Sequence, residues 1–189
     1  MKNFKDVLIR LQACYEAMEW AGDKTLQEIW ETCERDDWML WLLRRSDLFK
    51  TDHRKFTMAK WVCVNQVRHL MTDKRSLNAL DVAYKYAIGE ASNEELETSA
   101  NAAYVAAAAI NATASAINAA ACAADAAACT ADAAAGSAGV SYAADASDAA
   151  ACAADATDVA RFNARFKMRS ICADEIRKVI NWNEITFDL

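Results

Sequence analysis

The chain has 189 residues, of which 54% are hydrophobic and 25% are charged, and its formal net charge is −6. This length suits one domain with a single good-sized core. Proline is absent, only four glycines occur, and apolar and polar residues do not alternate over any long stretch, which excludes a β-rich fold and predicts an all-α protein.

The charge is unevenly distributed. Residues 101–160 contain six aspartates and no lysine or arginine, so this segment accounts for the whole net charge. No basic stripe is visible, and nucleic acid is therefore not an expected partner. The first twenty residues carry charges throughout, and Asn and Asp interrupt the alanine tract, so neither a signal peptide nor a membrane span is expected. The sequence predicts a soluble protein.

Cysteine usage indicates buried thiols and not a metal site. Seven cysteines occur, none in a CxxC pair, and neither of the two histidines has cysteine partners at ligand spacing. We therefore predict small buried hydrophobes in a reducing cytoplasm, with no metal and no cofactor. The P-loop, GxGxxG, GxSxG and HExxH motifs are all absent, so the chain is not expected to be an enzyme.

The first 45 residues predict three helices. An amphipathic helix over residues 4–20 ends before Gly22, and Asp23 caps the next, which places Trp30 and Cys33 on its apolar face. Continuing that helix would put Asp37 on the same face. We therefore expect a break, with Asp37 as the N-cap of a short apolar helix that ends in two arginines.

Two more helices are predicted over 53–71 and 74–88, the second ending at Gly89. Ser92 and Glu95 have the spacing of a capping box, so a further helix begins near Asn93.

Residues 92–182 predict a long helical hairpin. Alanine makes up about half of residues 101–160, and "GSAG" at 136–139 is the expected turn. Polar residues recur every seven positions, at Asn111, Asn118, Asp125 and Asp132 and again at Asp148 and Asp155. This repeat keeps the polar row on one helix face and leaves alanines for close packing on the other. The chain then divides into a mixed bundle (1–91), the hairpin (92–182) and a tail (183–189).

Three groups are candidate contact sites, each with a simpler structural interpretation. The aspartate row is either a solvated face or an acidic strip for a basic partner. It comprises Asp125, Asp132, Asp145, Asp148, Asp155 and Asp158. Trp30, Trp38 and Trp41 are core residues or a binding hot spot. Arg161, Arg165, Lys167 and Arg169 form a solvated helix face or a contact for phosphate or an acidic partner.

The segment W-x-x-C-E-R-D-D-W-M-L-W-L at 30–42 resembles the alanine-rich immunity proteins of bacterial polymorphic-toxin systems, often called immunity protein five. So do residues 80–109, the repeated Ala-Ala-x-Ala-Ala segments and "ADEIRKVI" at 173–180. Similar proteins are carried by bacteriophages. The chain departs from the resemblance at Asp36, where glycine is expected, and in using Asn or Asp where many relatives have tyrosine or arginine among the alanines.

This resemblance implies a non-enzymatic inhibitor that binds another protein, either a toxin or, for a phage gene, a host defence protein. The alternative is a structural or assembly module that forms homo-oligomers through its alanine-rich face. An ice-binding helix is disfavoured because Thr113, Thr130 and Thr157 lack a regular eleven-residue spacing. A nucleic-acid mimic is disfavoured because six aspartates are far sparser than the phosphates of DNA.

Overall fold

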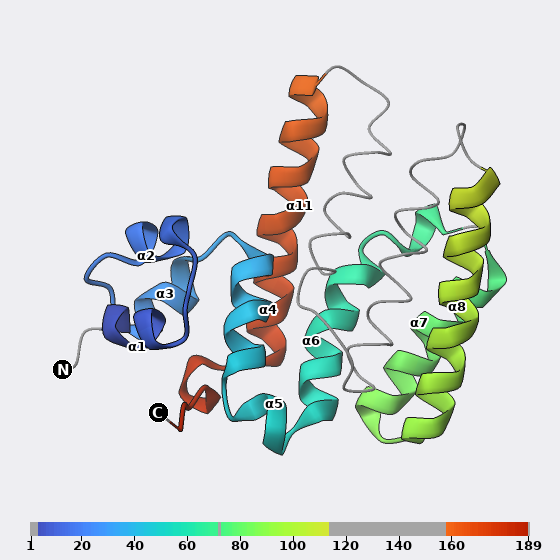
Figure 1. Ribbon diagram of the computed structural model, residues 1–189, viewed down its shortest axis with the longest axis horizontal. Helices are drawn as coiled ribbons and strands as arrows, with labels where there is room; N and C mark the ends of the chain where they lie inside the picture. The colour runs from blue at the N-terminus through green and yellow to red at the C-terminus, as the bar shows by residue number, and fades with distance from the viewer. Residues whose placement is uncertain (1–3, 72, 114–157, 189) are drawn as a thin grey trace.

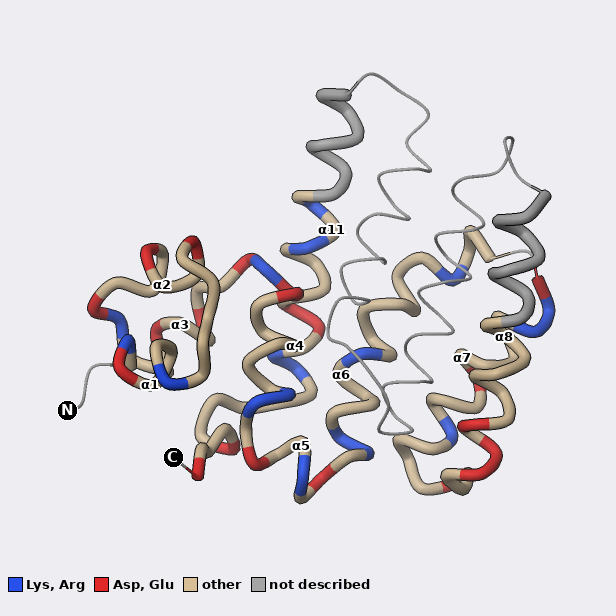
Figure 2. The backbone as a smooth tube through the Cα atoms, viewed as in Figure 1, with Lys and Arg blue, Asp and Glu red and all other residues tan. Residues whose placement is uncertain are grey.

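The computed structural model describes residues 4–71, 73–113 and 158–188. All regular secondary structure in these ranges is helical, which confirms the all-α prediction. Among the described helices, none combines the length and apolar character that crossing a membrane requires. Acidic and basic residues are interspersed along these helices, and the described part of the chain carries no continuous basic stripe (Figure 2).

Three short helices form a cluster at the N-terminal end of the molecule (Figure 1). They are α1 (Phe4–Arg10), α2 (Tyr15–Ala21) and α3 (Leu26–Thr32). The single helix expected over 4–20 is therefore wrong. The chain turns at Gln12, whose φ is 59°, and both Leu11 and Ala13 are buried. Residues two positions apart in one continuous helix would point to different sides of it. Because the helix is interrupted here, the side chains of both Leu11 and Ala13 reach the core.

Helix α3 begins two residues later than a cap at Asp23 would place it. Its N-cap is Thr25, whose hydroxyl accepts from the Glu28 N–H at 3.2 Å, while the Glu28 carboxylate accepts from the Thr25 N–H at 2.8 Å. This capping box satisfies two main-chain donors, which a single Asp23 cap would not do.

The predicted break before the next helix is confirmed, but its cap is not Asp37. Helix α4 spans Asp36–Arg45, and Arg35 occupies the N-cap position. Asp37 lies inside the first turn, where its carboxylate pairs with arginine side chains and does not cap the helix. The helix ends in Arg44 and Arg45, as the sequence predicts.

The middle of the chain forms consecutive helices joined by short connections. They are α5 (Leu48–Thr51), α6 (His53–Asn65), η1 (Arg68–Leu70), α7 (Lys74–Ile88) and α8 (Asn93–Thr113). Short connections make α6, α7 and α8 antiparallel neighbours, and α7 packs against both of the others (Figure 1). The helix expected over 53–71 instead stops at Asn65 and continues as a 3₁₀ turn.

The predicted ends of α7 and α8 are confirmed. Gly89 adopts φ 91° as the C-cap of α7. The Ser92 hydroxyl accepts from the Glu95 N–H at 3.2 Å, and the Glu95 carboxylate accepts from the Ser92 N–H at 2.8 Å.

Helix α11 (Asp158–Val179) lies between α4 and α6, although those helices end more than ninety residues earlier in the chain (Figure 1). Its Cys172, Ala173 and Ile176 are fully buried in the largest core cluster. The turn at 136–139 and most of the predicted hairpin lie outside the described residues. The described ends of that hairpin pack on different helices, α8 on α7 and α11 on α4 and α6.

The C-terminal segment is part of the core, although the sequence predicts a tail over 183–189. Asn181 caps the turn η3 (Trp182–Glu184) and forms a capping box with Glu184. Ile185 is buried, and the Phe187 ring packs on Phe4 with a centroid distance of 5.8 Å. The two ends of the chain thus stabilise the same cluster.

Candidate functional site

Two neighbouring carboxylates on the first turn of α4 face different surroundings. Asp36 is fully buried toward α6 and α11, whereas Asp37 lines a cavity beside the N-terminal helices. Successive residues on a helix point about 100° apart, so one turn supplies both sites. The sequence ERDDW therefore places one acidic group in each of two environments.

The carboxylate of Asp37 is held by two arginines. It accepts hydrogen bonds from Arg35 Nε at 2.8 Å and Arg35 Nη2 at 2.6 Å, and Arg169 Nη2 lies 3.9 Å away. Burial opposes its ionisation, but the Arg35 hydrogen bonds and the Arg169 charge outweigh it and hold the pKa of Asp37 below its usual value. Asp37 is therefore a charged anchor between the N-terminal cluster and α11.

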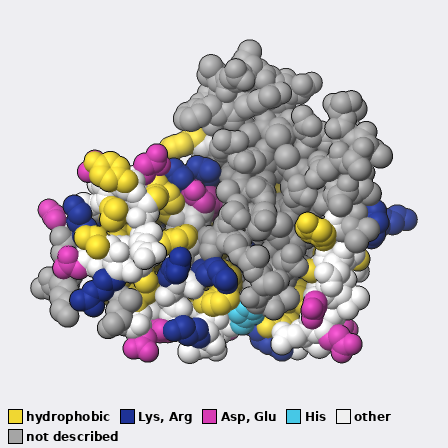
Figure 3. Space-filling view, in the orientation of Figure 1, with side chains coloured by type: hydrophobic (Ala, Val, Ile, Leu, Met, Phe, Trp, Pro, Cys, Tyr) yellow, Lys and Arg dark blue, Asp and Glu magenta, His cyan; other side chains and the backbone are white. Residues whose placement is uncertain are grey.

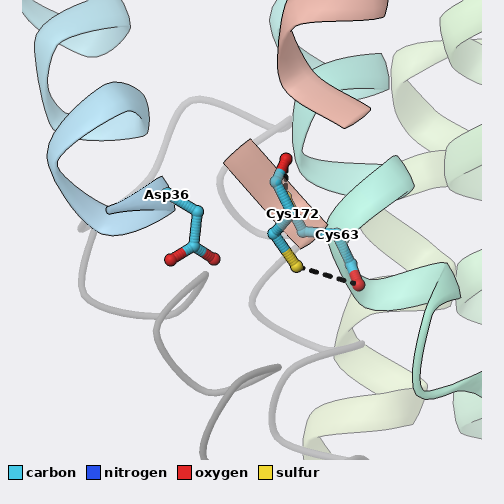
Figure 4. Close-up of side chains that lie close together, drawn as sticks. All are labelled: Asp36, Cys63 and Cys172. Atoms are coloured by element: carbon cyan, nitrogen blue, oxygen red, sulfur yellow. Dashed lines mark hydrogen bonds between the residues drawn. The ribbon is translucent and has the colours of Figure 1, made fainter. Parts of the chain in front are cut away.

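Asp36 lies beside two buried thiols, Cys63 on α6 and Cys172 on α11 (Figure 4). One ligand-type atom from each of the three side chains lies within 4.8 Å of the other two. Cys63 Sγ donates to the Ala59 carbonyl at 3.4 Å and to the Cys172 carbonyl at 4.0 Å, and Cys172 Sγ donates to the Cys63 carbonyl at 3.8 Å. These contacts join α6 to α11 directly.

The Asp36 carboxylate is an unusual core group. Within the described part of the chain, neither of its oxygens accepts a hydrogen bond of good geometry. Burial, reinforced by the negative charge of Asp37, raises the pKa of Asp36 to about 7, and the nearby Arg169 charge and Cys172 thiol only partly oppose this. Burial likewise raises the pKa of Cys63 well above its usual value. Asp36 and Cys63 are therefore both neutral in mildly acidic solution.

The second candidate site is an apolar cavity of about 240 Å³ between the N-terminal cluster and α4. Aromatic side chains dominate its wall and are contributed by Trp20, Trp30, Trp38 and Trp41. Three of these rings carry a cation on one face. Lys24 lies 4.5 Å from the Trp20 ring, Arg35 lies 4.3 Å from Trp38, and Arg45 lies 5.7 Å from Trp41. Cation–π contacts of this kind hold indole rings in place around a hollow.

The cavity walls contain few groups capable of chemistry. Asp37 is already paired, and the Cys33 thiol donates to the Arg35 carbonyl at 3.4 Å. Burial raises the pKa of Cys33 to about 11, so the thiol stays protonated at neutral pH. On the face shown in Figure 3, exposed apolar side chains over the N-terminal helices are interspersed with charged ones.

The structure describes only some of the predicted contact residues. Asp125, Asp132, Asp145, Asp148 and Asp155 lie outside the described residues, and Asp158 begins α11 with its side chain also outside that description. Trp30 is a buried core residue, Trp38 and Trp41 are half-buried, and all three line the cavity.

The basic cluster on α11 is partly explained by internal contacts. Lys167 is exposed, but Arg169 belongs to the Asp37 ion pair. The structure does not describe the side chains of Arg161 and Arg165.

Sequence reasoning missed the Asp36, Cys63 and Cys172 cluster. The three residues come from separate helices, 27 and 109 positions apart, and no local spacing announces them. The one signal was Asp36 itself, an acidic residue where the family resemblance leads one to expect glycine.

No family model, curated protein or solved structure matches the chain. The resemblance to immunity proteins therefore stays a prediction.

Proposed function

We propose that the chain is a non-enzymatic inhibitor that binds another protein directly, in the manner of an immunity protein. Its target is a toxin or, if the gene is carried by a phage, a host defence protein. The observation that carries this proposal is the tryptophan-lined cavity beside α4. Its volume of about 240 Å³ is below the roughly 300–1,000 Å³ typical of small-molecule sites and suits an apolar side chain of a partner.

The chemistry of the cavity favours binding over catalysis. A general base needs a pKa near neutrality, and a cysteine nucleophile needs a thiolate. Asp37 is locked in an arginine pair with a lowered pKa, and Cys33 keeps its proton because its pKa is about 11. Tryptophan, by contrast, is one of the residues enriched at binding hot spots.

The aspartate row supplies a second element of the proposal. Six acidic residues without a basic neighbour in residues 101–160 attract a basic surface over long range and speed association. We propose that the row steers the partner and the cavity anchors it. Action in the cytoplasm, of the host if the gene is viral, fits the free thiols of Cys14, Cys33, Cys63 and Cys172.

The proposal is tested by photo-crosslinking in cells that naturally carry the gene. A benzophenone amino acid replaces Tyr15, an exposed residue at the start of α2 that directly follows the cavity residue Cys14, and in a matched variant it replaces Tyr104, an exposed tyrosine of α8. The expected result is one dominant protein adduct at position 15 and none at position 104.

The other outcomes separate the alternatives. Equal background at both positions would contradict cavity binding. Adducts with a second copy of the chain would favour the assembly module, whose alanine-rich face lies mainly in residues outside the description.

A further inference from the structure

We infer that Asp36, Cys63 and Cys172 form a binding site for a thiophilic divalent cation, with Zn²⁺ as the ion whose ligand preferences they match. The site is separate from the cavity and does not depend on the proposed partner. Two sulfur ligands and one carboxylate oxygen are standard zinc donors, and thiolates disfavour Mg²⁺ and Ca²⁺.

The geometry needs little adjustment to hold the ion. With Zn–S near 2.3 Å and Zn–O near 2.1 Å, tetrahedral coordination separates neighbouring ligand atoms by about 3.5–3.8 Å. The three atoms already lie within 4.8 Å of one another. Side-chain rotations that move each atom by less than about 1 Å would bring them to these separations, with water as the fourth ligand.

The unpartnered carboxylate is the independent observation that points to a ligand. Asp36 is fully buried and extends from α4 toward the two thiols, and neither of its oxygens accepts a hydrogen bond of good geometry from a described residue (Figure 4). A buried carboxylate without a partner is costly, and coordination to a cation removes that cost. The thiol hydrogen bonds that metal binding would replace are long and weak, between 3.4 and 4.0 Å.

The surrounding charge suits the occupied site. Binding requires both thiols and Asp36 to be ionised, and their protons pass to solvent. Two thiolates and one carboxylate around Zn²⁺ leave one net negative charge. Lys60, buried three residues before Cys63 on α6, has a positive charge that favours the Cys63 thiolate. The charge of Lys60 would balance the net negative charge of the occupied site.

The position assigns a structural role to the ion. Its ligands come from α4, α6 and α11, and all three ligand residues are buried, so an ion there would tie these helices together without meeting a substrate. Structural zinc contributes directly to folding free energy. We therefore expect the ion to stabilise the seating of α11 between α4 and α6.

The experiment is a Co²⁺ titration of the reduced full chain, followed by displacement with Zn²⁺. Wild-type protein should bind one equivalent and show a thiolate-to-cobalt charge-transfer band with tetrahedral visible bands. Cys63→Ala and Cys172→Ala should lose the charge-transfer band, and Asp36→Asn should weaken Co²⁺ affinity by about tenfold or more. Cys33→Ala removes a buried thiol outside the cluster and should bind like wild type.

A second measurement guards against variants that fold poorly. Zn²⁺ should raise the melting temperature of wild type and of Cys33→Ala, but not that of Cys63→Ala, with far-ultraviolet circular dichroism confirming helix content. The site would be overturned by any of three results. These are wild type lacking the sulfur band at one equivalent, both cluster cysteine variants retaining it, or Asp36→Asn binding as tightly as wild type.

Discussion

The Arg177 guanidinium on α11 donates a hydrogen bond of 2.8 Å to the Trp30 carbonyl at the end of α3. A second hydrogen bond reaches the Cys33 carbonyl. Helix C-termini leave carbonyl groups without partners, and one arginine here satisfies two of them. In return, Trp30 Nε1 donates to the Ile180 carbonyl at 3.2 Å. The N-terminal cluster is thereby joined to the last helix by reciprocal polar contacts.

Arg177→Met keeps much of the aliphatic stem and removes both hydrogen bonds. We expect it to lower the free energy of unfolding by about 1.5–3 kcal/mol, as for hydrogen bonds to charged groups. Lys178→Met is the matched control, because Lys178 is exposed and pairs with Glu175 on the surface of the same helix, and it should change stability by less than about 0.5 kcal/mol. Urea unfolding measures both. Equal losses would show that Arg177 contributes no more than a surface charge.

Gly89→Ala tests the end of α7. A side chain at φ 91° is strained, and a Cβ atom there would lie 3.0 Å from Arg54 Nη1, which itself donates to the Tyr86 carbonyl at 3.1 Å. We expect a loss of about 1–2 kcal/mol from the backbone, with a further loss from displacing Arg54.

The Arg54 contribution is isolated by a double-mutant cycle. In an Arg54→Ala background, Gly89→Ala should cost less than in wild type. The same cost in both backgrounds would assign the whole effect to backbone strain.

Asp37 tests which interaction dominates the start of α4. Asp37→Ala should cost about 0.5–2 kcal/mol on either interpretation, as a lost cap or as a lost ion pair. Asparagine is a good N-cap but carries no charge, so Asp37→Asn distinguishes them. Because Asp37 pairs with Arg35 and Arg169, we expect Asp37→Asn to lose nearly as much as Asp37→Ala, and both losses to shrink at high salt. If Asp37→Asn were as stable as wild type, the capping interpretation would be restored.

The sequence predicted helices well where local chemistry decided them. Gly89, the Ser92–Glu95 box and the break before α4 are all local signals, and each is confirmed. Prediction from the sequence failed where residues distant in the chain determine the local structure. Arg169 lies 132 positions from Asp37, so its pairing is not visible in a local pattern, and the burial of Leu11 and Ala13 depends on helices packed later. The cluster of Asp36, Cys63 and Cys172 was missed for the same reason.

His53 makes the stability of the folded protein depend on pH. Burial lowers its pKa, assisted by the positive charges of Lys60 on α6 and Arg44 on α4, and its ring packs against Phe49 with centroids 4.9 Å apart. A histidine with a depressed folded pKa binds fewer protons when folded, so its contribution to stability is lost as pH falls below about 6.5. His53→Gln should therefore show a shallower loss of stability than wild type between pH 7 and pH 5, measured by urea unfolding at each pH. Parallel curves would contradict this assignment.

Filling the cavity tests the proposed anchor. Once crosslinking has identified the partner, Ala17→Trp should occupy the space beside Trp20 and Trp38 and weaken partner binding by about tenfold or more, since hot-spot contacts contribute 2 kcal/mol or more. Ala102→Trp adds the same side chain on α8 and should leave affinity unchanged. Loss of affinity in both variants would indicate a general effect of added bulk.

Steering by the aspartate row is tested by association rates. Changing Asp125, Asp132, Asp148 and Asp155 together to asparagine should slow association with the same partner and flatten its dependence on salt. Stopped-flow measurements at low and high salt compare the variant with wild type. Identical rates and salt slopes would make the row a solubilising face only.

On the proposed function, the chain acts by occupying its partner and not by catalytic turnover. The direct measurement is the residual activity of the partner as purified chain is added in increasing molar ratio at concentrations well above the dissociation constant. Direct binding predicts a linear fall that ends at a fixed stoichiometric ratio, is independent of incubation time, and is reversed when the complex is separated. Complete and progressive inactivation by a small fraction of an equivalent would show that the chain is a catalyst and would contradict the proposal.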